Sequence, residues 1–259
     1  MAIRKCVVAV PARLQSSRLP NKVLADIGGQ PMIQRGLERC RQARTVEAVV
    51  LCTDSAELQA RAEAWGFPVL MTSESCSSGS ERIASVAHPL MALAWGDAGP
   101  VAAETAVINV QGDQPFIDPA VIDAMVEEFR RQDPVPAVVT PVYGLKPESV
   151  HNPNVVKTLL AHDGRALYFS RSAIPHVRDV AEADWHQHTT YWGHVGMYGF
   201  RGDVLAAWDQ LPASPLEDLE RLEQLRLIEA GLTIATFPVE GTSLSVDTAE
   251  QLEQARAMV

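Results

Sequence analysis

The stretch VVAVPARLQSSRLPNKVL, residues 7–24, decides the fold and points to an anion-binding loop. It begins with an apolar run that is typical of a buried strand and that stops at Pro11. Three cations, Arg13, Arg18 and Lys22, follow among small and polar residues. Because open parallel sheets bind ligands at the carboxyl ends of their strands, this loop lies where an α/β protein would hold a charged ligand.

Apolar runs and helical patterns alternate along most of the chain. Such alternation predicts parallel strands joined by crossover helices, and therefore a doubly wound α/β fold with a mainly parallel sheet. We expect strands over 6–10, 48–52, 68–71, 105–110, 137–142 and 233–238, and helices over 32–42, 56–65, 215–230 and 248–258.

Residues 152–203 interrupt this alternation. The pieces VVKTLLA and GHVGMYGF are typical of strands, whereas the segment between them is irregular and aromatic, with Trp185, Tyr191 and Trp192. We therefore expect a single domain over residues 1–259 with an excursion over 152–203.

Composition excludes several classes of protein. The chain has 259 residues, 47% of them hydrophobic, and 22 Lys+Arg against 32 Asp+Glu give a net charge of −10. This charge argues against nucleic-acid or membrane partners. No apolar run approaches the ~20 residues that a bilayer needs. The N-terminus lacks a signal-peptide cleavage site, so we expect a cytoplasmic protein. Its cysteines show no CxxC spacing and are expected to be reduced thiols.

The basic loop matches neither common nucleotide fingerprint. It lacks GxxxxGK[ST] and GxGxxG, so the P-loop and dinucleotide-binding interpretations lose their main support. Arg13 can bind phosphate oxygens through paired hydrogen bonds, and Lys22 can bind them as a point charge. Taken alone, such a loop fits a solvated surface equally well, but its position after the first strand favours a functional role.

Two further stretches each contain an aspartate that could bind a metal. INVQGDQP, residues 108–115, predicts a strand followed by Asp113, beside Gly112, which lets the backbone approach a ligand. SVDTAEQL, residues 245–252, places Asp247 in the same way before a helix. Carboxylates at strand ends are a common means of holding Mg²⁺ beside phosphates, although a lone aspartate is more often a turn residue.

Eight segments, in this order, resemble the signature of the CMP-Kdo synthetase family, the 3-deoxy-manno-octulosonate cytidylyltransferases: PARLQSSRLPNKVL, MTSESCSSGSER, INVQGDQP, NPNVVK, ALYFSRSAIP, HVGMYGF, SPLEDLERLEQLR and SVDTAEQL. The resemblance runs from about residue 5 to 257. It implies a Rossmann-like nucleotidyltransferase fold and transfer of CMP from CTP to the anomeric hydroxyl of 3-deoxy-manno-octulosonate (Kdo), with release of pyrophosphate. It also implies a Mg²⁺ cofactor, a homodimer formed through the excursion and a role in lipopolysaccharide biosynthesis, with capsule synthesis left open.

The resemblance also implies roles for individual residues. Catalysis would depend on Arg13, Lys22, Asp113 and Asp247, of which the two aspartates would hold the metal. CTP would be bound by Pro11, Ala12, Arg13, Arg18, Lys22, Met71, Thr72, Ser78, Gly79 and Gln111. The sugar acid would be bound by Arg171, His194, Tyr198, Glu223 and Gln224. Without the resemblance, a surface charge, packed sheet residues and a Glu223–Arg226 helical ion pair would be the favoured interpretations of the sugar residues.

The sequence departs from the family pattern at several positions. The family usually has a basic residue near Ser73, a histidine where Cys76 stands, an acidic residue at Gln114 and a tryptophan at His176. These departures spare the predicted triphosphate and metal residues and bear on nucleobase and sugar contacts.

Two alternatives stay open at this point. One is the same cytidylyl transfer to another acid sugar, an 8-amino-Kdo or a nonulosonate. The other is a noncatalytic nucleotide-binding module, which would need neither carboxylate. A metal site at His186 and His188 is disfavoured, because the sequence offers no third ligand and solvent exposure explains the pair.

Overall fold

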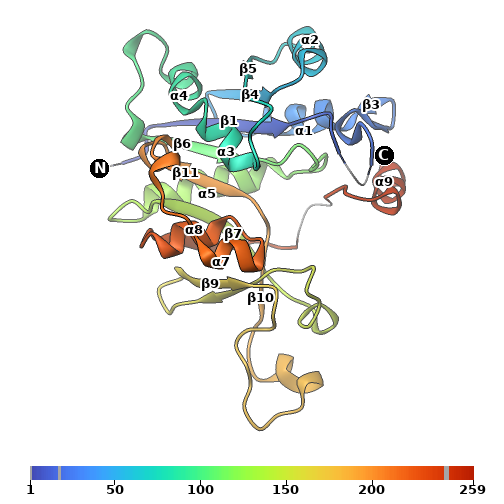
Figure 1. Ribbon diagram of the computed structural model, residues 1–259, viewed down its shortest axis with the longest axis vertical. Coiled ribbons are helices and arrows are strands. Elements are labelled where there is room, and N and C mark those ends of the chain that lie inside the picture. Colours follow the sequence, from blue (N-terminus) through green and yellow to red (C-terminus); the bar gives the residue numbers. More distant parts are fainter. Residues whose placement is uncertain (1, 17–18, 242–244) are drawn as a thin grey trace. The chain divides into compact units, whose positions relative to one another are not determined.

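The computed structural model describes residues 2–16, 19–241 and 245–259 (Figure 1). Its internal contacts divide the chain into two compact units. Unit 1 contains residues 1–135, 199–209 and 243–259, and unit 2 contains residues 136–198 and 210–242. The expectation of a single domain with an excursion over 152–203 stays a prediction.

Unit 1 is built on a mainly parallel sheet that matches the predicted alternation. Its strands are ordered β5 (Val69–Met71), β4 (Ala48–Thr53), β1 (Lys5–Ala12), β6 (Thr105–Asn109) and β11 (Tyr198–Arg201), the last of which begins one residue before the unit. β1 runs parallel to both β4 and β6, and β4 runs parallel to β5. β1 is buried from Cys6 to Ala12, as expected of a central strand that is covered on both faces.

Helices cover this sheet, and local sequence explains where several of them begin. Side-chain oxygens of Ser55, Ser78 and Asp118 accept hydrogen bonds from the first turns of α2, α3 and α5, and Thr248 forms a capping box with Gln251 at α9. The helices are α1 (Met32–Cys40), α2 (Ala56–Ala64), α3 (Gly79–Ala84), α4 (Ala87–Trp95), α5 (Pro119–Arg131), α6 (Gly202–Ala206) and α9 (Ala249–Arg256). The 3-10 turns are η1 (Lys22–Leu24), η2 (Gly96–Ala98), η3 (Ala102–Glu104) and η6 (Trp208–Gln210), which ends at the boundary of the unit.

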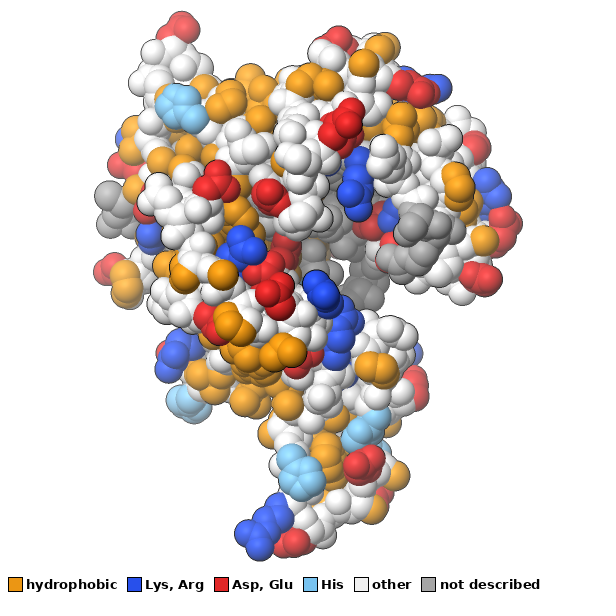
Figure 2. Space-filling model, viewed as in Figure 1, with side chains coloured by type: hydrophobic (Ala, Val, Ile, Leu, Met, Phe, Trp, Pro, Cys, Tyr) orange, Lys and Arg blue, Asp and Glu red, His pale blue; other side chains and the backbone are white. Residues whose placement is uncertain are grey.

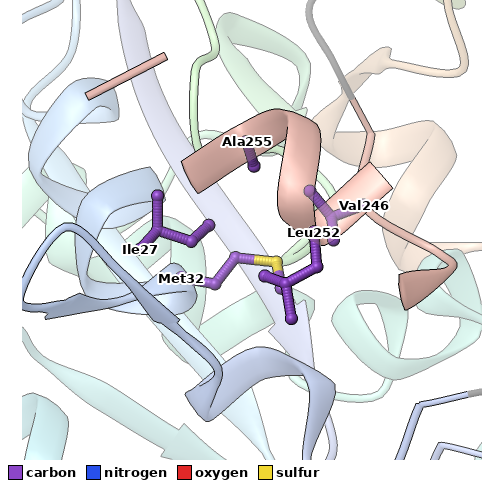
Figure 3. Packing of buried hydrophobic residues seen from close by; sticks show 5 residues of the cluster. All are labelled: Ile27, Met32, Val246, Leu252 and Ala255. Atoms are coloured by element: carbon purple, nitrogen blue, oxygen red, sulfur yellow. The ribbon is translucent and has the colours of Figure 1, made fainter. Parts of the chain in front are cut away.

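An apolar cluster joins the two ends of the chain within unit 1 (Figure 3). Ile27 lies in the small hairpin of β2 (Asp26–Ile27) and β3 (Gln30–Pro31), and Met32 begins α1. Figure 3 shows both side chains directed toward the C-terminal segment, where Val246, Leu252 and Ala255 complete the cluster. The packing therefore brings the residues around position 247 close to those around position 22.

Unit 2 contains a mixed sheet. Its strands are ordered β12 (Ile234–Pro238), β7 (Val138–Gly144), β10 (Trp192–His194), β8 (Lys157–Leu160) and β9 (Ala166–Ser170). β12 and β7 are parallel, whereas the remaining pairs are antiparallel. α7 (Pro215–Glu220), α8 (Gln224–Glu229) and the 3-10 turns η4 (Pro147–Ser149) and η5 (Glu182–Gln187) complete the unit. The predicted helix over 215–230 was wrong in its continuity, because Arg221 adopts a left-handed conformation with φ 54° and ends α7.

The irregular aromatic segment packs on its own unit. Trp185 and Tyr191 are buried together with Val150, and the Tyr191 hydroxyl donates to the carbonyl of Pro175 at 2.6 Å. The segment around Trp185 and Tyr191, here called the arm, is orange near the bottom of Figure 1. In Figure 2, hydrophobic side chains lie next to histidines on its surface. His186 and His188 are exposed, which agrees with the interpretation that they are solvated.

Among the described residues, no helix has both the length and the apolar character required to cross a bilayer.

Candidate active site

A lysine and two aspartates from distant segments meet in unit 1. The Lys22 Nζ donates to Asp113 Oδ2 at 2.8 Å and to Asp247 Oδ1 at 2.9 Å. Burial alone would lower the pKa of Lys22, but the neighbouring carboxylates, Asp113 first, outweigh burial and raise this pKa. Lys22 is therefore a firmly held cation, and the predicted convergence of the two carboxylates is present.

Local structure holds both carboxylates in place. Gly112 precedes Asp113, and a Cβ atom there would lie 3.0 Å from the Pro11 carbonyl oxygen, a tight contact, so glycine favours this close approach of the loop to β1. The backbone N–H of Val246 donates to the carbonyl of Asp113 at 2.9 Å. The backbone N–H of Asp247 donates to Gln251 Oε1 at 2.8 Å, at the start of α9. The two acidic segments are thus bonded directly to each other.

These residues lie on the wall of a cavity of about 300 Å³ in unit 1. Most of the residues predicted to bind CTP also line it, namely Pro11, Ala12, Arg13, Lys22, Ser78, Gly79 and Gln111. Arg13 is exposed, whereas Gln111 donates to Asn109 Oδ1 at 3.2 Å and is thereby oriented. The cavity combines fixed cations, acidic groups and glycine-rich backbone, which suits a ligand that carries both phosphate and hydroxyl groups.

The structure does not bring every predicted CTP residue to this cavity. Met71 is 44% exposed. Neither it nor Thr72 lines the cavity wall. The Thr72 hydroxyl instead accepts a hydrogen bond from Arg82, which does line the wall. Arg18 lies outside the described residues.

Several lining residues were missed from sequence, and Arg82 is the most informative. Its side chain is 3% exposed and is paired with Asp54 at 2.7 Å, and it also donates to the Ser73 carbonyl at 3.4 Å. It therefore ties the end of β4 to the segment after β5. Its partner Asp54 is 28 residues away in the chain, so no local sequence signal indicated this contact. The other missed lining residues are Gln15, Ser16, Val23, Cys76, Ser77 and Gly112.

The predicted sugar residues all belong to unit 2, where Arg171 holds backbone segments together. Its guanidinium donates to the carbonyls of Glu220 at 2.8 Å, Pro153 at 3.2 Å and Arg221 at 3.4 Å. The fully buried Lys157 donates to the Arg171 carbonyl and to two others nearby. Arg171 is thus oriented by its surroundings, and a guanidinium has five N–H groups, so donors remain for a ligand.

Three more predicted sugar residues form a connected group. The His194 ring packs between Phe169 and Tyr198, with ring centroids 5.0 and 5.3 Å away. The Tyr198 hydroxyl donates to Gln224 Oε1 at 2.8 Å. Burial, assisted by Glu223, raises the pKa of Tyr198, and burial lowers the pKa of His194 to about 3. Both side chains are therefore neutral near pH 7.

Glu223 is the N-cap residue of α8, and Arg226 in this helix pairs with Glu217 at 2.6 Å. No cluster of three or more His, Cys, Asp or Glu residues suited to a metal ion occurs within residues 2–16, 19–241 and 245–259. The Asp113–Asp247 pair is smaller than such a cluster, so any metal there needs further ligands from a substrate.

Comparisons with known proteins identify the family of this chain. The sequence model of the cytidylyltransferase family matches residues 7–234. The 3-deoxy-manno-octulosonate cytidylyltransferase of Chlorobaculum tepidum is 40% identical over 255 residues, 97% of this chain and 96% of that protein. The enzyme of the same name from Chlorobium limicola is 41% identical over 256 residues, 98% of this chain and 96% of its own length.

A solved structure is similar over nearly its whole length. It is that of CMP:2-keto-3-deoxy-manno-octonic acid synthetase complexed with CTP, which superposes with a TM-score of 0.88 at 38% identity and covers 98% of both chains. A thymidylyltransferase structure from Bacillus anthracis, at 14% identity and a TM-score of 0.65, shares the fold. The family expected from the sequence segments is confirmed: the chain belongs to the cytidylyltransferases, among the 3-deoxy-manno-octulosonate cytidylyltransferases.

Proposed function

We propose that this protein transfers CMP from CTP to the anomeric hydroxyl of Kdo and releases pyrophosphate. The observation that carries the proposal is the convergence of Lys22, Asp113 and Asp247 on one cavity, in a chain that matches enzymes of this name almost end to end. The reaction is a direct displacement. The sugar oxygen bonds to the α-phosphorus of CTP while the bond from that phosphorus to the α,β-bridging oxygen breaks.

A magnesium ion fits the two carboxylates. Asp113 and Asp247 already share one cation, the ammonium of Lys22, so their oxygens converge as cation ligands must. Mg²⁺ is commonly held by one or two carboxylates together with substrate phosphates. When bound, such an ion would supply Lewis-acid activation of the phosphate and sugar oxygens.

Lys22 and Arg13 act on the triphosphate. With Asp113 and Asp247 holding a divalent cation, the Lys22 ammonium would be available to a phosphate oxygen of a ligand in the same cavity. Negative charge builds on the leaving pyrophosphate, and fixed positive charge stabilises it. Arg13 can add paired hydrogen bonds to the phosphate oxygens because of its planar guanidinium.

Residues of unit 2 hold the acid sugar in this proposal. Arg171 binds the carboxylate, and His194, Tyr198, Glu223 and Gln224 bind its hydroxyls. The buried Gln224 Nε2 has no hydrogen-bond partner among the described residues, which supports a role as a donor to a polar ligand.

We also propose a homodimer that uses the arm with Trp185, Tyr191 and Trp192. The alternative is an arm that serves its own subunit only, which the burial of Trp185 and Tyr191 within unit 2 equally permits. Sedimentation at micromolar concentration distinguishes the two, because a species of only 28.2 kDa contradicts the dimer.

A pyrophosphate-release panel tests the proposed reaction. Four nucleoside triphosphates are combined with Kdo, 8-amino-Kdo and a nonulosonate at millimolar Mg²⁺. We expect release with CTP and Kdo, and none from an Asp113→Asn, Asp247→Asn double variant that keeps its fold. A preference for one of the other two sugars would assign that sugar, rather than Kdo, as the substrate. CTP binding without release for any sugar would instead indicate a noncatalytic nucleotide-binding module.

A further inference from the structure

Thr140 is hydrogen-bonded to His194, a predicted sugar-binding residue. It lies in β7, is fully buried, and its Oγ1 is 2.6 Å from the Met197 carbonyl oxygen and 2.9 Å from His194 Nε2. A hydroxyl has one hydrogen, and a carbonyl oxygen can only accept, so this hydrogen goes to Met197. The Thr140 oxygen is then available to His194 only as an acceptor. Nε2 must therefore carry the imidazole proton.

Unit 1 contains the same arrangement around Trp95, whose ring nitrogen can only donate a hydrogen bond. The Thr105 hydroxyl donates to the Val101 carbonyl at 2.8 Å and accepts from Trp95 Nε1 at 2.8 Å. An indole Nε1–H can only donate, so this buried threonine must accept from it. Thr105 thus shows the hydrogen-bond direction inferred for Thr140, and it provides a matched control.

The surroundings keep His194 neutral. Phe169 from β9 and Tyr198 from β11 pack on the ring, Thr140 faces it from β7, and the carboxylate of Glu223 acts on Tyr198. With the pKa of His194 lowered to about 3 by burial, the ring holds one proton at neutral pH. Because that proton is on Nε2, Nδ1 has a free lone pair.

Gln224 is complementary to this acceptor. Its Oε1 accepts from Tyr198, which packs against His194, so its amide keeps the buried and unpartnered Nε2 as a donor. A sugar hydroxyl can donate and accept at once. Within one connected group, His194 thus supplies an acceptor and Gln224 a donor.

We propose that Thr140 is a positioning residue that fixes His194 as the Nε2–H tautomer, so that Nδ1 accepts a hydrogen bond from a hydroxyl of the acid sugar. The inference rests on the proposed function and assigns His194 a role in binding. A group that is so weakly basic would be a poor general base near pH 7.

Nitrogen-15 spectra of the histidine side chains test the tautomer in the free protein. The His194 signals are identified by their loss in His194→Gln. We expect a neutral ring protonated on Nε2 from pH ~5.5 to ~8. Thr140→Val should change the tautomer population, whereas Thr140→Ser, which keeps the hydroxyl, should keep the wild-type population. A charged ring, an Nδ1–H tautomer in the wild type, or no change in a folded Thr140→Val variant would overturn the proposal.

Kinetics test the consequence for the sugar. In Thr140→Val, we expect the KM for Kdo to rise roughly five- to tenfold, the change that follows from losing one ordinary hydrogen bond. The KM for CTP should stay constant, and Thr140→Ser should recover most of the effect. Thr105→Val loses bonds of the same kind and should lower thermal stability without a change in the KM for Kdo.

Equal kinetic effects of Thr140→Val and Thr105→Val would reduce Thr140 to a purely structural role and overturn the proposal. If Thr140→Val does not fold, the wild-type spectra and the Thr140→Ser kinetics still decide. Failure of the proposed function looks different, because the wild type would then release no pyrophosphate from CTP with Kdo. In that case the sugar half of the inference falls with the function, whatever the spectra show.

Discussion

Replacing Lys22 with methionine should convert a balanced ion cluster into two opposed carboxylates. Since Asp113 Oδ2 and Asp247 Oδ1 lie 2.8 and 2.9 Å from the same nitrogen, these oxygens are at most about 5.7 Å apart. At an effective dielectric of ~20, two unit charges at that separation repel by about 3 kcal/mol. The Asp247 side chain is 33% exposed, so solvent screening should reduce the cost to about 1–2 kcal/mol.

The loss depends on pH in a direction that follows from this repulsion. Without Lys22, the two carboxylates repel each other in the folded state, and acid removes this repulsion by neutralising one of them. The folded state then binds more protons, so the stability deficit is largest near pH ~7.5 and shrinks as pH falls toward ~5. At pH ~7.5 we expect Lys22→Met to melt about 2–8 °C below the wild type.

Magnesium supplies a readout that is independent of turnover. A divalent cation relieves the repulsion that Lys22 normally offsets, so millimolar Mg²⁺ should raise the melting temperature of Lys22→Met more than that of the wild type. The control is Lys22→Met combined with Asp113→Asn, which removes one of the opposed charges. It should be more stable than Lys22→Met and should lose the Mg²⁺ response. A double variant no more stable than Lys22→Met would refute the reasoning.

Four further outcomes are expected. Asp113→Asn and Asp247→Asn should each lower turnover by orders of magnitude, and their combination should add little, because the pair acts as a unit; near-normal turnover in either variant argues against the metal site. Arg171→Lys should weaken sugar binding roughly tenfold and hardly change CTP affinity, since lysine cannot form paired hydrogen bonds to a carboxylate; calorimetry with each ligand measures this, and equal losses would remove Arg171 from the site. Cys76 lines the cavity, so iodoacetamide should label it before the other cysteines, and CTP should slow that labelling as read by peptide mass spectrometry; labelling insensitive to CTP contradicts the nucleotide assignment. The lowered pKa of His194 makes the unfolded chain bind more protons between pH ~6.5 and ~3, so stability is lost as pH falls through this range; from pH ~8 to ~5, His194→Gln should lose about 2 kcal/mol less than the wild type in urea unfolding.

The alternation of strands and helices was predictable because burial on both faces leaves near-continuous apolar runs. β1 is the clearest case, buried from Cys6 to Ala12. The break at Arg221 was not predictable in the same way. A left-handed residue at a helix end is usually glycine, and here an arginine adopts φ 54°. Its carbonyl accepts from Arg171, a contact between segments far apart in sequence.

In the candidate site too, local patterns were predictable and contacts between distant segments were not. Asp113 and Asp247 could be predicted because each follows a strand-like stretch and precedes a turn or helix, a local pattern. Arg82 could not, because its sequence neighbours do not reveal that it is buried against Asp54 from another strand. Met71 and Thr72 were predicted to bind CTP, but neither lines the cavity. Family resemblance indicated Thr72 as a CTP residue, but Arg82 of α3, which donates to the Thr72 hydroxyl, lines the cavity instead.

The position of Asp247 depends more on apolar packing than on the charge that it meets. A partly exposed ion pair such as Lys22–Asp247 contributes about 0–1 kcal/mol, whereas ordering each residue of a chain end costs about 1–2 kcal/mol. Burial of side chains such as Val246 and Leu252 contributes about 1.5–3 kcal/mol each, more than the ion pair does. The cluster in Figure 3 therefore fixes the C-terminal segment, and the Val246–Asp113 backbone bond sets its register. The ion cluster can then exchange its cation without loss of the surrounding structure, as a site that binds and releases a charged substrate requires.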